Sequence, residues 1–313
     1  FERVENQLVP SLALEMTRVA VGASTFQIKS SNASSEEAYG AQTGINHIKL
    51  GPLTIQPSLF LQVLWPILLA SWVAKDPLRV KAASNITVLL LWFLLLMMPV
   101  LWQPDIGSVA ILAVVSAYVL GVAGLPGSIL VRFLPIFFVF ALLVLYLFPH
   151  VYDRLNTFQS QENYQVSRAQ EAFANGGWTG VGPGNGVLKY GHIPESTTDF
   201  VLALIAEEWG ILGCCLVWGL FIAITFLGMK LARECKHTYG VLLMSGATVV
   251  ISFQAAYNMA MILGTVPVKG LPLPFVSRGG SSLLALSLLL GIAVNATRSQ
   301  LRRKPGKFTP TIS

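Results

Sequence analysis

The chain has 313 residues, of which 54% are hydrophobic and 12% are charged, and its formal net charge at pH 7 is +6. About a quarter of the residues of a soluble domain are charged, so this composition excludes an ordinary soluble protein. The apolar runs approach the ~20 residues that a helix needs to cross a bilayer, and they exceed the ~10-residue strands of a membrane barrel. The sequence therefore predicts an all-α, polytopic helical membrane protein.

Residues 1–50 differ from the rest of the chain. Glu15 and Arg18 interrupt their best apolar run, and they contain neither an initial Met nor a signal-peptide pattern. We expect this segment to be atypical, with the sequence at or upstream of it truncated or altered.

Residues 51–300 contain the apolar segments that predict membrane-spanning helices. There are seven: Pro57–Ala74, Ile86–Trp102, Gly107–Leu125, Ser128–Phe148, Phe200–Met229, Tyr239–Leu263 and Gly279–Ala296. The fifth is too long for one straight crossing. We therefore expect a short interfacial helix around Asp199–Gly210, after which the chain enters the bilayer.

Basic residues gather after the first, fifth and seventh segments. They are Lys75, Arg79, Lys81, Lys230, Arg233, Lys236, Arg298, Arg302, Arg303, Lys304 and Lys307. Seven alternating spans put all three clusters on one side, which the positive-inside rule assigns to the cytoplasm. The tail of residues 301–313 is then a cytoplasmic anchor to anionic lipid, and its charge does not indicate nucleic-acid binding.

The opposite, extracellular side receives Gln103–Gly107, Gly264–Gly280 and one large loop of residues 149–199. Loops of this length are usually functional or disordered, and the aromatic residues, Asn and clustered Gly of this one predict an ordered loop. Asp105 stands where an N-cap is expected for the helix that begins at Gly107.

The glycine cluster "NGGWTGVGPGNG", Asn175–Gly186, has two interpretations. It fits neither dinucleotide-binding nor P-loop spacing, so a tightly turning surface loop is the simpler one. In the other, its backbone N–H groups and Lys189 hold a lipid-linked pyrophosphate.

Asp199 immediately precedes an apolar run. It is a candidate N-cap for the helix that follows, a role that a neighbouring threonine can share. A carboxylate at a membrane interface is also a candidate general base, and the two roles do not exclude each other. We expect Glu207 and Glu208 to accept hydrogen bonds from neighbouring loops, and Glu195 to face water.

Several basic residues lie on the predicted extracellular side, against the positive-inside tendency. They are Arg154, Arg168, Lys189, Lys269 and Arg278. They either cover a solvated loop surface or bind an anionic head group at the outer leaflet.

Four segments together resemble the SEDS family (shape, elongation, division and sporulation). "GVGPGNGVLKYGHIPESTTDFVLALIAEEWGILG" is similar to the family's large extracellular loop and following helix, and "LGTVPVKGLPLPFVSRGGSSLLALSLLLGIAVNATR" to its last loop and span. "IKLGPLTIQPSLF" and "QPDIGSVAIL" resemble two earlier motifs of the outer face. The match covers about residues 47–300. The strings "KGLPLPF" and "NATR" resemble the cell-division branch more than the elongation branch.

The resemblance implies a fold of about ten transmembrane helices, of which the chain would contain the last seven. It implies a peptidoglycan glycosyltransferase that polymerises lipid II at the outer face of the bacterial cytoplasmic membrane, in septal wall synthesis. The implied partners are a class B penicillin-binding protein and other division proteins, and no organic cofactor is implied. Arg and Lys side chains, or a divalent cation such as Mg²⁺ or Mn²⁺, would neutralise the leaving pyrophosphate.

The resemblance also implies roles for single residues. It places the family's essential acid on Asp199, in "PESTTDF", as the base that deprotonates the GlcNAc 4-hydroxyl. The candidate substrate-binding residues are Lys189, Arg154, Glu195, Lys269, Arg278, Ser281 and Ser282. Two departures change the charge of the expected cavity: Leu59 replaces the acid of the family's "QPSE", and Arg278 replaces the Tyr of "SYGGSS".

Two other functions stay open. A flippase for a lipid-linked precursor should have ionisable residues along its spans, and only Arg132 clearly lies within one. A non-catalytic scaffold of the division machinery is compatible with a truncated N-terminus.

Overall fold

The computed structural model describes residues 2–4, 7–9, 48–50, 53–55, 57–102, 105–129, 131–132, 135, 146, 164–187 and 198–301. The chain divides into two compact units, Phe1–Thr43 and Gly44–Ser313. In the first unit, β1 (Glu2–Val4) and β2 (Gln7–Val9) form an antiparallel hairpin. In the second, β3 (Ile48–Leu50) and β4 (Leu53–Ile55) form another just before the first long helix. The sequence predicts neither, because three-residue strands are too short to show an alternating pattern.

Six of the seven predicted spans are helices, and the fourth, Ser128–Phe148, lies largely outside the described residues. The helices are α3 (Pro57–Lys75), α4 (Ala83–Trp102), α5 (Ile106–Val122), α9 (Val201–Glu234), α10 (Thr238–Ile262) and α11 (Gly280–Leu301). A 3₁₀ helix, η1 (Pro77–Lys81), joins α3 to α4, and α8 (Tyr164–Gly176) lies in the large loop. Among the described helices, α3, α9, α10 and α11 are long and apolar enough to cross a membrane, while α4 and α5 have shorter apolar stretches.

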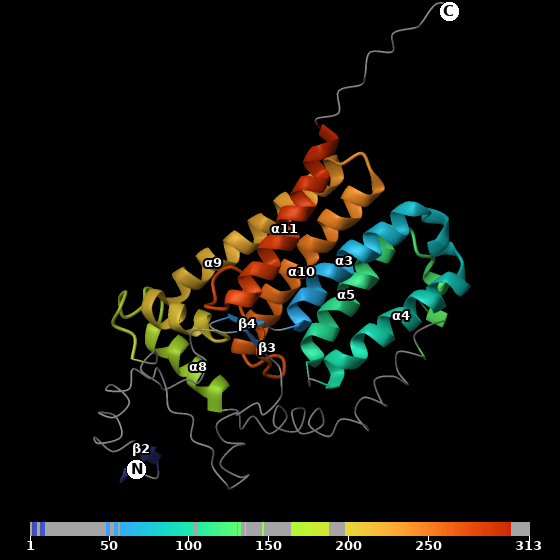
Figure 1. Ribbon diagram of the computed structural model, residues 1–313. Coiled ribbons are helices and arrows are strands. Elements are labelled where there is room, and N and C mark those ends of the chain that lie inside the picture. Colours follow the sequence, from blue (N-terminus) through green and yellow to red (C-terminus); the bar gives the residue numbers. More distant parts are fainter. Residues whose placement is uncertain are drawn as a thin grey trace, which may run out of the picture. The chain divides into compact units, whose positions relative to one another are not determined.

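Helix α10 lies between the other long helices and contacts α3, α5, α9 and α11 (Figure 1). Small residues allow this close approach, as is usual between membrane helices. A Cβ at Gly228 of α9 would lie 2.2 Å from the Thr248 hydroxyl of α10. One turn away, the hydroxyls of Thr225 and Ser252 share a hydrogen bond of 2.7 Å between the same helices.

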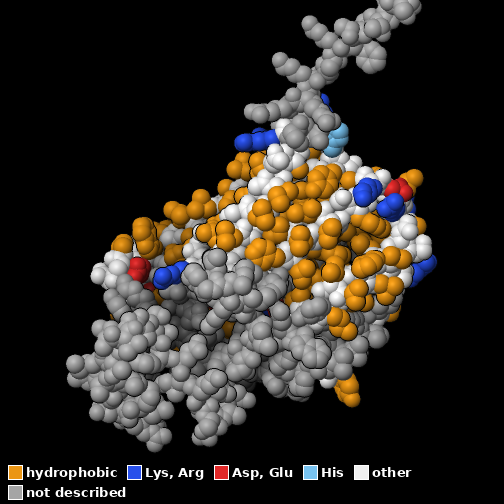
Figure 2. Space-filling model, viewed as in Figure 1, with side chains coloured by type: hydrophobic (Ala, Val, Ile, Leu, Met, Phe, Trp, Pro, Cys, Tyr) orange, Lys and Arg blue, Asp and Glu red, His pale blue; other side chains and the backbone are white. Residues whose placement is uncertain are grey.

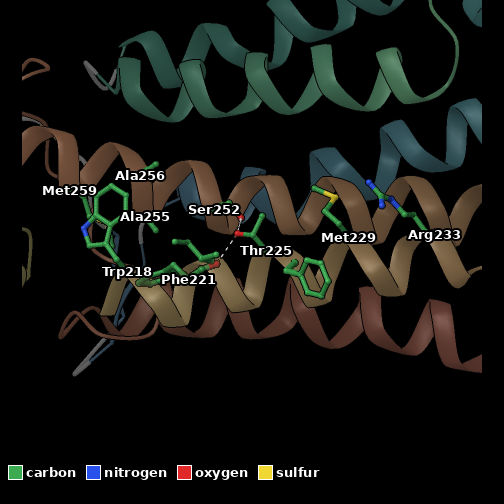
Figure 3. A pocket seen from close by; sticks show the side chains of 11 residues that line it. Trp218, Phe221, Thr225, Met229, Arg233, Ser252, Ala255, Ala256 and Met259 are labelled. Atoms are coloured by element: carbon green, nitrogen blue, oxygen red, sulfur yellow. Dashed lines mark hydrogen bonds between the residues drawn. The ribbon is translucent and has the colours of Figure 1, made fainter. Parts of the chain in front are cut away.

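A groove of about 520 Å³ lies between the same two helices and runs from Trp218 to Arg233 (Figure 3). Aromatic and aliphatic side chains of α9 and α10 line most of it. The Thr225–Ser252 hydrogen bond stands at its wall. Figure 2 shows hydrophobic side chains spread over the described surface between the two ends of the helices, with the charged side chains toward the ends.

Helix α9 is broken at Gly210, as the sequence predicts. Gly210 has φ 66° and ψ −165°, so two helical segments meet there at a kink. A Cβ at Gly210 would lie 2.5 Å from the Trp178 carbonyl group, and only glycine adopts this conformation without strain. The carbonyls of Gly177 and Trp178 accept hydrogen bonds from the Ile211 and Leu212 amides, so the large loop caps the second segment.

Helices α3, α9 and α11 end at one end of the bundle, and α10 begins there (Figure 1). Lys75, Arg233 and Arg298 stand in the last turns of these three helices. The described members of the three basic clusters therefore lie at a common end, as predicted, and we call it the basic end. The opposite end, where α5, α9 and α11 begin and α10 finishes, is called the loop end.

Candidate functional site

Asp199 lies at the loop end, immediately before α9. The N-cap of α9 is Phe200, which makes no side-chain capping hydrogen bond, so the prediction that Asp199 is the N-cap is wrong. The helix starts later than predicted because of tertiary contacts. Phe200 is buried in the core, and the Asn258 side-chain amide donates to the Asp199 carbonyl at 2.8 Å. These contacts start the helix one residue later and leave the Asp199 side chain half-buried.

A polar stripe on α10 holds the loop between α10 and α11, which we call the α10–α11 loop (Leu263–Gly279). Its members are Gln254, Tyr257 and Asn258, which share one helix face because they are three and four residues apart. Their side chains donate to the carbonyls of Pro272 (2.9 Å), Pro267 (3.0 Å) and Leu271 (2.6 Å), respectively. A proline-rich loop pairs few of its own carbonyls, so the stripe supplies their partners.

The α10–α11 loop forms a wall against the Asp199 carboxylate. A Cβ at Gly270 would lie 2.8 Å from Asp199 Oδ2, so no larger residue fits there without displacing the carboxylate. The Leu271 amide donates to the Lys269 carbonyl at 2.7 Å, which makes a tight turn centred on Gly270.

Lys269, next to this glycine, forms a buried ion pair with Asp105 of the "QPDIG" motif. Asp105 is the N-cap of α5, as predicted, and it accepts from the Ser108 amide (3.1 Å) and hydroxyl (2.8 Å). Burial acts to raise the pKa of Asp105, but the Lys269 ammonium and the hydrogen bonds from Lys269 and Ser108 hold it below the usual carboxyl value. Lys269 is thus paired inside the protein, which disfavours the predicted contact of its ammonium with a lipid head group.

The first turn of α5 is shaped to receive the Lys269 side chain. A Cβ at Gly107 would lie 2.6 Å from Lys269 Cδ, so the lysine stem lies directly over this glycine. The sequence does not reveal this pair, because its members are 164 residues apart and only the capping role of Asp105 follows from its neighbours.

The glycine cluster packs on α9 and uses its backbone amides there. The Val181 and Gly182 amides donate to the carbonyls of Glu207 and Glu208, at 3.0 and 3.1 Å. The carboxylates of the same two residues accept from the amides of Val187 (3.0 Å) and Gly184 (2.9 Å). The predicted roles of Glu207 and Glu208 are confirmed. Because these four amides already have acceptors, the geometry favours the tightly turning loop over a pyrophosphate cradle.

The remaining predicted site residues are distributed around this centre. Arg278 is exposed at the end of the α10–α11 loop, and Ser281 and Ser282 lie in the first turn of α11, with Ser282 buried. Leu59, which replaces an acid of the family motif, is buried in the apolar core at the start of α3. The other three, Arg154, Lys189 and Glu195, lie outside the described residues.

The arrangement at the loop end suits proton transfer. Asp199 is a half-buried carboxylate whose backbone is fixed from α10 and whose side chain meets a rigid turn. A positioned carboxylate of this kind can accept a proton from a hydroxyl group that is being activated for attack. Within the described ranges, no three His, Cys, Asp or Glu side chains gather closely enough to hold a metal ion. The divalent cation stays a prediction.

An all-α bundle of membrane-length helices with a carboxylate at one end defines a polytopic helical membrane protein. The family profile of FtsW, RodA and SpoVE, described as cell cycle proteins, matches residues 16–302. The chain therefore belongs to the SEDS family, and its spans and its family place it in the bacterial inner membrane.

Individual relatives support the same family assignment. A probable peptidoglycan glycosyltransferase FtsW of Caulobacter vibrioides is 30% identical over 273 residues, which cover 86% of this chain and 68% of that protein. The same-named protein of Marinobacter nauticus is 40% identical over 214 residues, 64% of this chain and 52% of that one. The chain thus spans about half to two thirds of the length of these curated relatives.

Two solved structures share the fold. A chain from a structure described as the structural coordination of polymerization and crosslinking by a peptidoglycan synthase complex matches with a TM-score of 0.67 and 26% identity, over 92% of this chain and 79% of that one. The rod shape determining protein RodA of Thermus thermophilus matches with a TM-score of 0.53 and 27% identity, over 85% of this chain and 78% of that one.

Proposed function

We propose that this chain is a peptidoglycan glycosyltransferase that polymerises lipid II, with Asp199 as its general base. The observation that carries the proposal is the placement of Asp199. It stands at the end of the bundle where the polar loops gather, beside the Gly270 turn, with its backbone held by Asn258. The names of the relatives support a peptidoglycan glycosyltransferase, and the contacts that hold Asp199 support its choice as the base.

In the proposed reaction, the Asp199 carboxylate takes the proton of the GlcNAc 4-hydroxyl of an incoming lipid II. The freed oxygen attacks the anomeric carbon of the lipid-linked sugar of the growing strand and forms the new glycosidic bond with inversion. The bond from that carbon to undecaprenyl pyrophosphate breaks, and the pyrophosphate leaves with the electron pair. Arg278, exposed near the first turn of α11, is a candidate partner for this charge, as are Arg154 and Lys189.

We also propose an orientation of the chain in the membrane and a protein partner. The loop end would face the outside and the basic end the cytoplasm, which follows from the positive-inside rule. The FtsW names of the relatives support a role in septal wall synthesis, and the synthase complex among the similar structures supports a class B penicillin-binding protein as partner. Lipid II and other division proteins belong to the same proposal.

The flippase and scaffold hypotheses receive less support. In the part of the chain that the structure describes, the buried charged side chains are Asp105, Glu207 and Lys269, all near the loop end. A translocation path through the bundle would place ionisable groups along its length. A scaffold, in turn, gives no reason for a carboxylate to meet a rigid glycine turn.

The test is a gel-based lipid II polymerisation assay with and without a cognate class B penicillin-binding protein and Mg²⁺ or Mn²⁺. Asp199→Asn should lower polymerisation by about 100-fold or more, because it removes the proton acceptor while keeping the shape of the side chain. Asp76→Asn is the matched control, since Asp76 caps η1 at the basic end and Asn caps helices equally well.

Each outcome has a clear meaning. Glycan ladders from the wild type and from Asp76→Asn, but not from Asp199→Asn, would support both the enzymatic activity and the assignment of the base. Normal ladders from Asp199→Asn would refute the base assignment. Partner binding without ladders from any variant would favour the scaffold, and lipid II movement across liposomes without ladders would favour the flippase.

A further inference from the structure

We propose that Lys269 and Asp105 form a positioning pair for Asp199, in which the buried ion pair fixes the α10–α11 loop so that Gly270 holds the carboxylate in place. This inference rests on the proposed function, because it needs Asp199 to be the base. It replaces the predicted role of Lys269 as a substrate-binding cation with an internal one.

The ion pair is separated from the proposed base by a single residue of the α10–α11 loop, Gly270. Lys269 directly precedes Gly270, and the hydrogen bond from the Leu271 amide to the Lys269 carbonyl closes the turn between them. The Lys269 amide is also held, since it donates to the Met261 sulfur of α10 at 3.2 Å. With these contacts in place, a shift of the Lys269 backbone moves the glycine that meets Asp199 Oδ2.

Asp105, the acidic partner of the ion pair, is held rigidly. Asp105 is fixed to the first turn of α5 by its two hydrogen bonds from Ser108, and the Gln62 amide of α3 donates to the Ser108 hydroxyl at 3.1 Å. A carboxylate held in this way on a helix terminus is a stable anchor. Lys269 reaches it by laying its stem over Gly107, and both charged groups are buried.

Helix α10 holds the Gly270 turn from the side opposite to the ion pair. One side-chain nitrogen, Asn258 Nδ2, donates both to the Asp199 carbonyl and to the Leu271 carbonyl. The turn at Gly270 is therefore held from α5 through Lys269 on one side and from α10 through Leu271 on the other. Removing one charge of a buried pair leaves the other uncompensated, which favours movement of the loop. The Gly270 wall would move with it.

The first experiment measures polymerisation kinetics of Lys269→Met, Asp105→Asn and the double variant. Asn retains the N-cap of α5, so Asp105→Asn removes the charge but not the cap. Each single variant should lower kcat by roughly 10- to 100-fold, because a base misplaced by about 1 Å loses that much. The KM for lipid II should stay near its wild-type value, since the pair does not touch substrate. Lys269→Arg should recover part of the loss.

Two comparisons separate positioning from general damage. The double variant should be no worse than either single variant, because it removes both buried charges together. Lys230→Met, at the basic end of α9, is the matched control and should keep wild-type kcat. A rise in KM with unchanged kcat for Lys269→Met would instead assign Lys269 to substrate binding and overturn the proposal.

A second measurement does not depend on activity. In a chain whose native cysteines, Cys214, Cys215 and Cys235, are replaced, Asp199→Cys is modified with a water-soluble methanethiosulfonate reagent. Adding Lys269→Met should raise the rate of modification several-fold, because the Gly270 wall moves away. If the wild type makes no glycan but this rate rises, the proposed function fails, and only the structural coupling between the Asp105–Lys269 ion pair and the Asp199 side chain stands. If neither kcat nor the rate of modification changes in Lys269→Met, the positioning pair is refuted.

Discussion

At the scale of single residues, Asp105 combines a helix cap with a buried ion pair, and this makes its contribution to stability depend on pH. Its pKa in the folded protein lies below the ordinary value of about 3.9. The ionised carboxylate therefore stabilises the folded state above about pH 4, and this contribution is lost as the pH falls through the folded pKa. We expect the melting temperature of the wild type to exceed that of Asp105→Asn at about pH 5, and the difference to shrink as the pH falls below about 4.

Thermal unfolding of the detergent-purified protein across this range measures the effect. Asp76→Asn serves as the comparison, because Asp76 pairs with Arg79 in an exposed ion pair that should contribute little at any pH. A difference between wild type and Asp105→Asn that stays constant over the whole range would contradict the assigned pair.

At the scale of elements, the contact between α8 and α9 depends on glycines that leave room for backbone. A Cβ at Gly176 would lie 1.9 Å from the Ala206 carbonyl oxygen, a clash that no side-chain rotation relieves because the Cβ position is fixed by the backbone and the oxygen is a backbone atom. We expect Gly176→Ala to lower the free energy of unfolding by about 1–3 kcal/mol, as overpacking usually does. Gly219→Ala, on α9 with nothing within 4 Å of its added Cβ, is the control and should be neutral or stabilising.

Unfolding temperatures of the two glycine variants, measured side by side, decide this prediction. Polymerisation should fall in Gly176→Ala as well, because α8 and the glycine cluster pack on the segment of α9 that follows Asp199. Equal stability of both variants would mean that the two helices separate at little cost.

The elements also show what the sequence can and cannot predict. Length and apolarity predict a helix at Pro57–Ala74, and the structure has α3 at Pro57–Lys75. The agreement is close because a membrane span depends on the local sequence. The break at Gly210 is equally local, since it follows from a run too long for one crossing. The start of α9 is not local. The burial of Phe200 and the bond from Asn258 override the capping preference of Asp199.

The candidate site is harder to predict than the helices for the same reason. Asp199 is found from its place before an apolar run and from the family motif, but its surroundings come from segments far along the chain. Gly270 is 71 residues later, and the Asp105–Lys269 pair joins two loops that no periodic pattern connects. The roles of Arg154, Lys189 and Glu195, which lie outside the described residues, stay predictions.

At the scale of the whole bundle, charge and polarity separate along the helices. The basic residues stand where α3, α9 and α11 end, whereas Asp105, Asp199 and the polar stripe of α10 stand at the loop end. A lipid-linked sugar would reach Asp199 only from the side of the membrane that the loop end faces. The proposed function therefore requires the loop end to be outside, which makes sidedness a test of it.

Cysteine labelling in intact cells measures this sidedness. Cys235 is a native, partly exposed cysteine next to the basic end of α9, and Thr265 is an exposed residue of the α10–α11 loop. In a background without Cys214 and Cys215, a membrane-impermeant maleimide should modify Thr265→Cys in intact cells, but should modify Cys235 only after permeabilisation. The reverse pattern would put Asp199 on the cytoplasmic side, where a polymerase that extends glycan outside the membrane cannot use it. That result would refute the proposed reaction, and with it the catalytic purpose of the positioning pair, while leaving the fold and the Asp105–Lys269 ion pair unchanged.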